Sequence, residues 1–304
     1  MKLIRDPFQH PMQSVVTIGN FDGVHKGHQT LIHALMAASH ELKLPSVLLT
    51  FEPNPTEFFS PQFLMPRLMR LSEKWAVIKK YGIDYFYCLR FNAALATLSA
   101  EDFVKKILVD QLHAKKIIVG DDFRFGAKRV GDIALLKILG EKYDFTVDAL
   151  PQWVYDNERI SSTRVRNSLK IGDFETVCAL TGRPFYLTGK VAHGDQIGRQ
   201  LGFPTANIHL RRKQVPLMGI FVVRVHGLRD AALPGVASIG YRPTFNGKKI
   251  VLEVFLFDFN EMIYGKKITV EFLSKIRDEL HFDSVDELVV QIEKDVVFAR
   301  EYFA

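Results

Sequence analysis

Two histidines three residues apart, His25 and His28, lie in a glycine-rich segment that reads GNFDGVHKGH over residues 19–28. An apolar run over 15–18 precedes this segment and a helical apolar pattern over 27–43 follows it. The histidines therefore belong to a strand-to-helix turn, where free backbone N–H groups and the helix dipole attract anions. Imidazoles placed there can stabilise the charge that develops during phosphoryl or nucleotidyl transfer.

The same histidines have two simpler explanations, a zinc site or surface residues of a flexible turn. A zinc site needs further Cys or His ligands. The chain has only two cysteines, Cys88 and Cys178, and they lack the spacing of a metal site or a disulfide framework. The combination of strand, glycines, histidines and helix favours nucleotide chemistry.

A second segment with phosphate-binding chemistry reads ISSTRVR over residues 160–166. Its hydroxyl groups can cap a helix, but capping does not explain Arg164 and Arg166, because cations at a helix N-terminus oppose the helix dipole. Hydroxyl, backbone N–H and guanidinium groups together suit phosphate oxygens. A further segment, GDDFRFG over 120–126, follows an apolar run, and on these residues alone a polar turn with aromatic anchors explains it equally well.

In the second half of the chain, residues 194–207 read GDQIGRQLGFPTAN. The glycines make a loop that can fold over phosphates. Thr205 and Asn207 alternate on an extended stretch, so their oxygens face the same side, and hard oxygens suit Mg²⁺. Without further information, a glycine-rich hairpin with a rigid proline remains the simpler explanation.

A carboxylate interrupts an apolar strand face at Glu253, which shares that face with Phe255 and Phe257 in the run LEVFLFD. A carboxylate in such surroundings should have a partner or a catalytic task. The alternative is a solvent-facing glutamate on an edge strand.

The elements that would position these residues differ between the two halves of the chain. In the first half, strand-like runs alternate with helical patterns, which predicts a parallel sheet covered on both faces, with ligands beyond the carboxyl ends of its strands. Strands are predicted over 14–18, 46–51, 83–89, 116–120 and 145–150, and helices over 27–43, 72–81, 99–112, 131–142 and 161–180. Gly182 fits the end of the last helix.

The second half is dominated by period-two alternation, which predicts an antiparallel barrel or sandwich. The alternating runs cover 186–191, 220–225, 236–239, 252–258 and 268–273. A final amphipathic helix begins with a capping box at Ser284. Its apolar stripe, which we expect to serve packing, consists of Val285, Leu288, Val289, Ile292 and Val296.

Length, charge and hydropathy restrict the function classes. A chain of 304 residues predicts two domains. The net charge of +6 is spread along the chain, and no nucleic-acid-binding signature accompanies it. No apolar run approaches the ~18 residues of a membrane helix, and no signal peptide is recognisable. We therefore expect a cytoplasmic protein that binds neither membranes nor nucleic acid; the sequence does not indicate its oligomeric state.

The GNFDGVHKGH and ISSTRVR segments resemble the signatures of the nucleotidyltransferase superfamily, and RQLGFPTAN resembles the GRxLGFPTAN motif of riboflavin kinases. Together they resemble the bacterial bifunctional riboflavin kinase/FMN adenylyltransferases over almost the whole chain. The resemblance implies a Rossmann-like adenylyltransferase domain over 1–183 and a β-barrel riboflavin kinase domain with a terminal helix over 184–304. The implied reactions convert riboflavin to FMN and FMN to FAD, with ATP as co-substrate and Mg²⁺ as cofactor.

The resemblance also implies roles for individual residues. Catalytic roles fall on His25 and His28 in adenylyl transfer and on Glu253 as the kinase base. ATP contacts in the adenylyltransferase fall on Gly19, Phe21, Asp22, Ser161, Ser162, Thr163, Arg164 and Arg166, and flavin contacts on Asp122, Phe123 and Phe125. In the kinase, ATP contacts fall on Gly194, Gly198, Arg199, Gly202, Thr205 and Asn207, a flavin contact on Arg277, and Mg²⁺ ligation on Thr205 and Asn207.

Four positions depart from the family patterns. Asn54 and Phe255 stand where the family usually carries histidine, and Ser238 and Asp122 where asparagine is familiar. Phe255 and Ser238 are the only support for one alternative, an adenylyltransferase with a decayed kinase domain. A nucleic-acid-binding protein built on a nucleotide-binding fold is the alternative outside the enzymes, and it predicts strongly salt-dependent binding.

Overall fold

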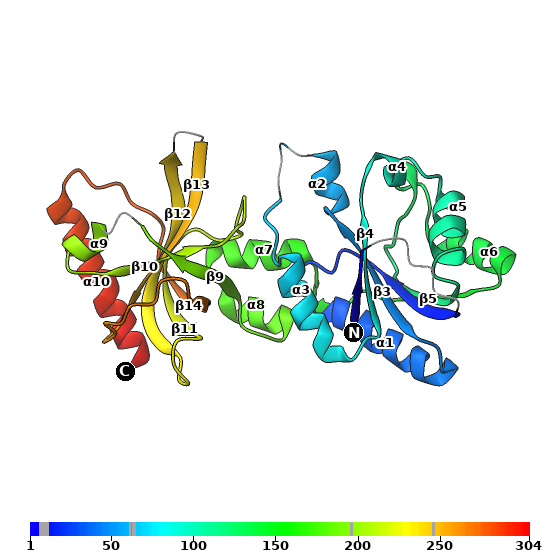
Figure 1. Cartoon of the computed structure of the whole chain (residues 1–304), viewed down its shortest axis with the longest axis horizontal. Coiled ribbons are helices and arrows are strands. Elements are labelled where there is room, and N and C mark those ends of the chain that lie inside the picture. The colour runs from blue at the N-terminus through cyan, green and yellow to red at the C-terminus, as the bar shows by residue number, and fades with distance from the viewer. Residues whose placement is uncertain (6–11, 61, 63–64, 195–196, 245–246) are drawn as a thin grey trace. The chain divides into compact units, whose positions relative to one another are not determined.

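The computed structural model describes residues 1–5, 12–60, 62, 65–194, 197–244 and 247–304. The chain forms two compact units, Met1–Ser162 and Thr163–Ala304, each with its own sheet (Figure 1). The sequence-based division falls later, between residues 183 and 184. Helix α8 and nearly all of α7 thus belong to the compact unit of the barrel, and where the two activities divide along the chain stays a prediction.

The first unit contains the predicted parallel sheet. Its six strands lie in the order β1 (Lys2–Ile4), β4 (Tyr85–Arg90), β3 (Ser46–Glu52), β2 (Ser14–Ile18), β5 (Ala114–Gly120) and β6 (Thr146–Leu150), and all neighbouring pairs are parallel. The three-residue β1 is too short to give an alternation pattern, so the sequence did not predict it. Because β2 is central, the turn that follows it lies at the middle of the carboxyl edge.

Helices cover both faces of this sheet, because successive strand residues point to opposite sides. Val15 and Leu48 face the helices α1 (Lys26–Leu42) and α3 (Leu71–Ile78), whereas Val16 and Leu49 face the other layer. That other layer is made by α5 (Ala100–Phe103), a π-helical segment η2 (Val104–Val109) and α6 (Ile133–Tyr143) (Figure 1). The helix predicted over 99–112 is therefore α-helical only in its first part.

Several short elements in the first unit escaped prediction. They are the helices α2 (Pro55–Phe59), η1 (Lys79–Tyr81), α4 (Ala93–Ala96) and η3 (Ala127–Arg129) and the hairpin strands β7 (Val154–Tyr155) and β8 (Glu158–Arg159). Each has five residues or fewer, so none repeats an apolar period.

The prediction of a single helix over 161–180 is wrong in one respect. This range contains two helices, α7 (Ser162–Ile171) and α8 (Phe174–Thr181). Gly172 has a φ of +84°, which breaks the helical path, and the Asp173 side chain then accepts a hydrogen bond from the Thr176 N–H at 2.9 Å. An N-cap of this kind starts a new helix. Gly182, with a φ of +69°, ends α8 as predicted.

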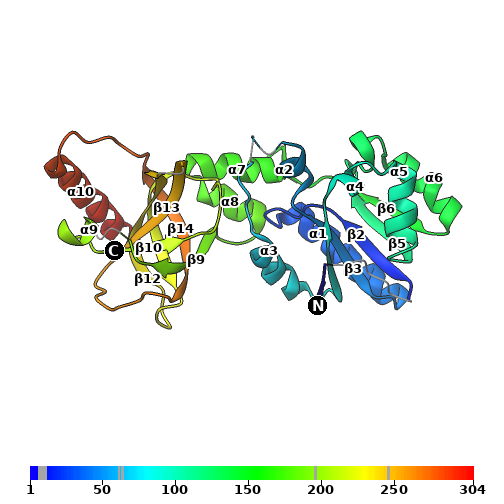
Figure 2. The same ribbon diagram turned by 45° about the horizontal axis from the view of Figure 1, so that its top comes forward.

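The second unit is a closed antiparallel barrel, which decides between the barrel and the sandwich (Figure 2). Around it lie β10 (Thr205–His209), β13 (Gly247–Leu256), β12 (Leu233–Thr244), β11 (Gly219–His226), β14 (Lys267–Arg277) and β9 (Tyr186–Ala192). The short helix α9 (Ile197–Gln200) precedes β10.

Helix α10 (Val285–Phe303) packs on the outside of the barrel strands (Figure 1). The Ser284 hydroxyl accepts a hydrogen bond from the Glu287 N–H at 3.2 Å, which confirms the predicted cap. The predicted stripe is wrong at Val285, which is 60% exposed. The buried face instead includes Ala299, which packs with Val222 and Phe257 of the barrel.

The packing of α8 on the barrel gives a test of where the second folding unit begins. Phe174 of α8 is buried, and its ring lies 6.0 Å from that of Phe221 and 6.2 Å from that of Phe272, measured between centroids. Burying one such ring stabilises a fold by about 1.5–3 kcal/mol. We predict that fragment 163–304 unfolds at a higher urea concentration than fragment 184–304, monitored by circular dichroism. Equal midpoints would contradict the assignment of α8 to the barrel unit.

Candidate active sites

His25 and His28 lie next to each other at the N-terminus of α1. His25 is the N-cap, with extended backbone, and its Nδ1 accepts a hydrogen bond from the His28 N–H at 3.4 Å. The two imidazole rings stack, with centroids 3.7 Å apart and planes at 18°. Because Nδ1 accepts this bond, the proton of neutral His25 resides on Nε2, which is then a donor. The pair thus combines a helix cap with an imidazole donor at the predicted phosphate turn.

The backbone of this turn adopts a conformation that favours glycine at three positions. Phe21, Gly23 and Val24 have φ values of +49°, +84° and +41°. The last is unusual, because a β-branched residue is strained there. Hydrogen bonds hold the turn: the Gln29 side chain donates to the Val24 carbonyl at 2.9 Å, and the Ser162 hydroxyl donates to the Asp22 carbonyl at 2.8 Å. Ser162 thus lies at the turn, and its contact with ATP stays a prediction.

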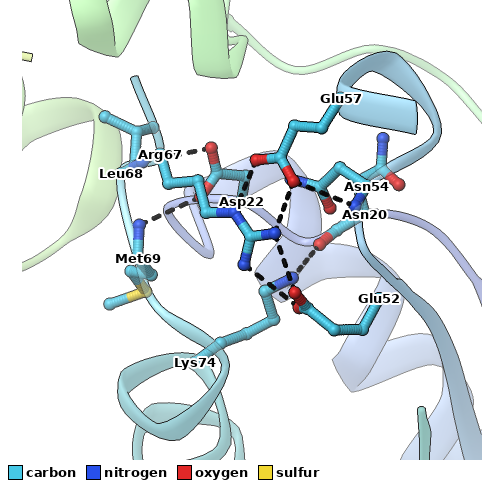
Figure 3. A network of polar contacts seen from close by, with 9 residues as sticks. All are labelled: Asn20, Asp22, Glu52, Asn54, Glu57, Arg67, Leu68, Met69 and Lys74. Atoms are coloured by element: carbon cyan, nitrogen blue, oxygen red, sulfur yellow. Dashed lines mark hydrogen bonds and ion pairs between the residues drawn. The ribbon is translucent and has the colours of Figure 1, made fainter. Parts of the chain in front are cut away.

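A polar network links the turn to the segment before α3 (Figure 3). The buried Asp22 carboxylate accepts hydrogen bonds from the backbone N–H groups of Leu68 and Met69 at 3.1 and 3.0 Å. The ammonium of the buried Lys74 donates to the Asn20 carbonyl at 2.5 Å. The structure therefore shows the Asp22 carboxylate in an anchoring contact, while its contact with ATP remains a prediction.

Arg67 occupies the centre of the same network. Its guanidinium group bonds to the carboxylates of Glu52 and Glu57, and these hydrogen bonds raise the pKa of Arg67 above its usual value. The backbone N–H of Asn54 donates to the Glu57 carboxylate at 3.3 Å, so the residue that replaces the familiar histidine starts α2. Sequence reasoning missed Arg67, Glu57 and Lys74. Lys74 had left a signal, because it lies on the apolar stripe between Leu71 and Ile78.

The GDDFRFG segment follows β5 at the same carboxyl edge. Asp122 forms an ion pair with Arg159 of β8. The rings of Phe123 and Phe125 stack with centroids 5.6 Å apart. Phe125 is buried in the core and a side chain at Gly131 would strike its ring, whereas Phe123 is only half-buried. Phe125 therefore supports the more exposed Phe123 from the core, and the flavin contacts expected at Asp122, Phe123 and Phe125 stay predictions.

In the barrel unit, two predicted site residues and Ser238 form a row across three neighbouring strands. Glu253 of β13 lies opposite Asn207 of β10 on one side and Ser238 of β12 on the other. Directly opposed residues of antiparallel strands have Cβ atoms about 4.5–5.5 Å apart and share a face. The next row on that face pairs Thr205 with Phe255. All five are only partly buried, so this face combines a carboxylate with hydroxyl and amide oxygens.

The glycine loop before β10 packs directly on this face. A Cβ at Gly194 would lie 2.3 Å from the Asn207 amide nitrogen, and a Cβ at Gly198 would lie 2.5 Å from the Phe203 carbonyl oxygen and 3.2 Å from the Thr205 hydroxyl. Close approach of the loop backbone thus requires glycine at both positions. Gly202 has a φ of +87°. The side chain of Arg199 lies outside the described part of the chain, and its ATP contact stays a prediction.

Arg277, predicted to contact flavin, is bound to α10 by a salt bridge. Its Nε and Nη2 atoms donate to the buried Asp295 carboxylate at 2.9 and 2.7 Å. Such a multidentate pair fixes the guanidinium plane. The structure thus shows Arg277 in a contact that joins β14 to the terminal helix, and a direct flavin contact stays a prediction.

The donor groups present limit the type of metal site that the described residues can form. Within the described residues, no group of three or more His, Cys, Asp and Glu side chains is arranged to hold a metal ion. Thr205 and Asn207 fit a different type of site, because Mg²⁺ takes few protein oxygens and completes its shell with phosphate and water. Their common face and the close loop backbone suit such an ion.

Residue types that suit phosphate chemistry therefore occur in both compact units, and the two units have unrelated folds. These features are those of a nucleotide-dependent transferase. Comparison with family models agrees: residues 8–164 match the FAD synthetase family and residues 181–303 match the riboflavin kinase family.

Known proteins that resemble the whole chain carry both activities in their names. A bifunctional riboflavin kinase/FMN adenylyltransferase of Escherichia coli K12 is 44% identical, covering 100% of this chain and 98% of that protein. Proteins of the same name from Pseudomonas fluorescens and Haemophilus influenzae are 46% and 43% identical; the alignments cover 94% and 95% of this chain and 92% and 94% of those proteins. The chain belongs to the family of bifunctional riboflavin kinase/FMN adenylyltransferases.

A solved structure has the same fold across both units. A crystal structure described as a macrolide-efflux protein from Streptococcus pneumoniae superimposes with a TM-score of 0.83 at 35% identity, covering 96% of this chain and 97% of that one. In the part of the present chain that the structure describes, no helix is both long and apolar enough to cross a membrane.

The packing of the glycine loop on Asn207 gives a direct test. We predict that Gly194→Ala displaces the Asn207 amide, because the new Cβ would overlap it, and that riboflavin phosphorylation then needs a higher Mg²⁺ concentration. FMN adenylylation should be unchanged. The measurement is a Mg²⁺ titration of both reactions, with Gln200→Ala, an exposed residue at the end of α9, as the control. An unaltered Mg²⁺ requirement in Gly194→Ala would contradict this role of the loop.

Proposed function

We propose that the chain phosphorylates riboflavin to FMN and adenylylates FMN to FAD, with ATP as the donor in both reactions, and that the polar face of the barrel carries the first reaction and the histidine turn the second. The observation that supports this division is the row Asn207–Glu253–Ser238 on the barrel, which lies in a different unit from the histidine turn. Each site has its own hydrogen-bonding groups, so each reaction should be separable by substitution.

In adenylyl transfer, an oxygen of the FMN phosphate attacks the α-phosphorus of ATP and pyrophosphate leaves. Negative charge grows on the α-phosphoryl oxygens during this step. This charge is stabilised by hydrogen-bond donors at the histidine turn. They are the Nε2–H of His25, the imidazole of His28 and the N-terminal N–H groups of α1. The half-buried Phe123 is the proposed flavin contact, and the ATP roles of Gly19, Phe21 and residues 161–166 remain predictions from the sequence.

In the kinase reaction, the 5′-hydroxyl of riboflavin attacks the γ-phosphorus of ATP, and ADP leaves. We assign Glu253 as the group that takes the hydroxyl proton. Thr205 and Asn207 are the proposed Mg²⁺ ligands, and the ion supplies charge neutralisation of the ATP phosphates when bound. The loop with Gly194 and Gly198 is proposed to lie over those phosphates.

The substitutions Phe255 and Ser238 do not support a decayed kinase. Phe255 packs its ring on Phe203 and Phe257, with centroid distances of 5.5 and 5.8 Å, and so belongs to the apolar contact between loop and barrel. Ser238 retains a hydroxyl beside Glu253. The residues proposed for proton transfer and metal binding are thus all present. A cytoplasmic location and the absence of nucleic-acid and membrane partners remain part of the proposal.

The role of the histidine turn is tested by His28→Ala. Loss of one donor to a developing charge typically costs about 10²–10³-fold in rate. We predict that FAD formation from FMN falls by this amount, while riboflavin phosphorylation by the same molecule persists. The measurement is chromatographic separation of the flavins, with His40→Ala, an exposed residue of the same helix, as the control. Near-normal FAD synthesis in His28→Ala would refute the assignment.

The role of Glu253 is tested by Glu253→Gln, which keeps the shape of the side chain and removes its basic group. General-base help is worth about 10²–10⁴-fold. We predict that FMN formation falls by this factor while conversion of supplied FMN to FAD stays near wild type. Glu261→Gln, an exposed carboxylate of the same unit, is the control. Unchanged kinase rates would remove Glu253 as the base, and equal loss of both reactions would indicate one shared site.

A further inference from the structure

Lys74 is a buried cation that no step of the proposed chemistry uses. Its side chain on α3 is 3% exposed, and its Nζ donates to the Asn20 carbonyl at 2.5 Å. An ammonium group has three donors. In the part of the chain that the structure describes, no carboxylate lies within 4.0 Å of this nitrogen.

The charged groups around Lys74 are engaged elsewhere (Figure 3). Glu52 pairs with Arg67, and Asp22 accepts its two backbone N–H bonds. Cys88 of β4 also faces this site, and burial raises the pKa of its thiol. Burial lowers the pKa of Lys74 despite the attraction of Asp22 and Glu52. A buried ammonium without a close carboxylate is unfavourable for folding, which suggests that its charge serves another purpose.

The partner of Lys74 is a backbone atom of the phosphate turn itself. Asn20 directly precedes Phe21, the first turn residue with a positive φ. The Thr50 hydroxyl donates to the same carbonyl at a longer 3.3 Å. The Asn20 carbonyl belongs to the peptide group between Asn20 and Phe21. The hydrogen bond from Lys74 therefore restrains the orientation of this peptide and of the strained turn that follows it. The Asp22 contacts with Leu68 and Met69 hold the turn two residues further along.

We propose that Lys74 is a positioning residue for adenylyl transfer, whose ammonium group holds the Asn20 carbonyl and thereby the turn that presents His25 and His28 to ATP. This inference rests on the proposed phosphate role of the turn. Misplacement of reacting groups by about 1 Å can reduce a rate about 10²-fold, so the restraint acts on kcat although Lys74 touches no substrate.

The test compares Lys74→Met, which removes the charge at similar length, with Lys74→Arg, which keeps it. We expect Lys74→Met to lower kcat of FMN adenylylation about 10²-fold with a smaller change in KM for ATP, and Lys74→Arg to restore a large part of kcat. Riboflavin phosphorylation by the same molecule should be unchanged. Lys80→Met, an exposed lysine just after α3, should leave both reactions at wild-type rates.

Two further measurements distinguish positioning from a merely structural role. Removing a buried charge should leave the melting temperature of Lys74→Met equal to or above that of wild type. Burial lowers the pKa of Lys74 from its ordinary value of 10.5, so the ammonium loses its proton before the pH reaches 10.5. The wild-type adenylylation rate should therefore already decrease as the pH rises toward 10.5. Lys74→Arg should keep its rate to higher pH, since guanidinium stays protonated.

Wild-type kcat in Lys74→Met would overturn the proposal, and so would a lowered melting temperature with parallel loss of both reactions. If Lys74→Met did not fold, the pH profiles of wild type and Lys74→Arg would decide, and identical alkaline limbs would overturn the proposal. His28→Ala serves as the reference for the proposed function: if it retained adenylylation, the role of the turn itself would fail, whatever Lys74 does.

Discussion

The contact of the Asp22 carboxylate with the backbone N–H groups of Leu68 and Met69 is the interaction on which the histidine turn, the proposed adenylyltransferase site, depends. Asp22 lies between Phe21 and Gly23, both of which have a positive φ. A backbone of this kind persists only where surrounding contacts determine it. The carboxylate supplies two such contacts from a segment 46 and 47 residues further along the chain. The geometry of the histidine turn is therefore a tertiary property.

The parallel sheet explains why these distant segments meet. The segments after β2, β3 and β5 all begin at the carboxyl edge, because neighbouring strands run in the same direction. Glu52 is the last residue of β3, and Arg67 binds it together with Glu57 of α2. Carboxylates and cations from three segments thus form one network beside the turn, and its contacts with backbone groups restrain the turn.

The proposed kinase face of the barrel depends on a different constraint, the register of its strands. Asn207, Glu253 and Ser238 become neighbours because β10, β13 and β12 pair in one particular alignment. A slip of one residue would turn Glu253 toward the barrel interior. The apolar residues Val254 and Leu252, both fully buried, oppose such a slip by filling that interior. The core of the barrel therefore fixes the position of its polar outer face.

The sequence by itself determined the classes of element, the parallel sheet, the turn with His25 and His28, and the alternating face with Thr205 and Asn207. These depend on local periodicity and on short motifs. The break at Gly172, the exposed Val285 and the salt bridge of Arg277 with Asp295 required the tertiary structure. So did the network around Arg67 and Lys74. The physical reason is that the hydrogen bonds and the burial of these side chains depend on partners far away in the chain. Those partners become neighbours only when the chain folds, so local sequence patterns do not reveal them.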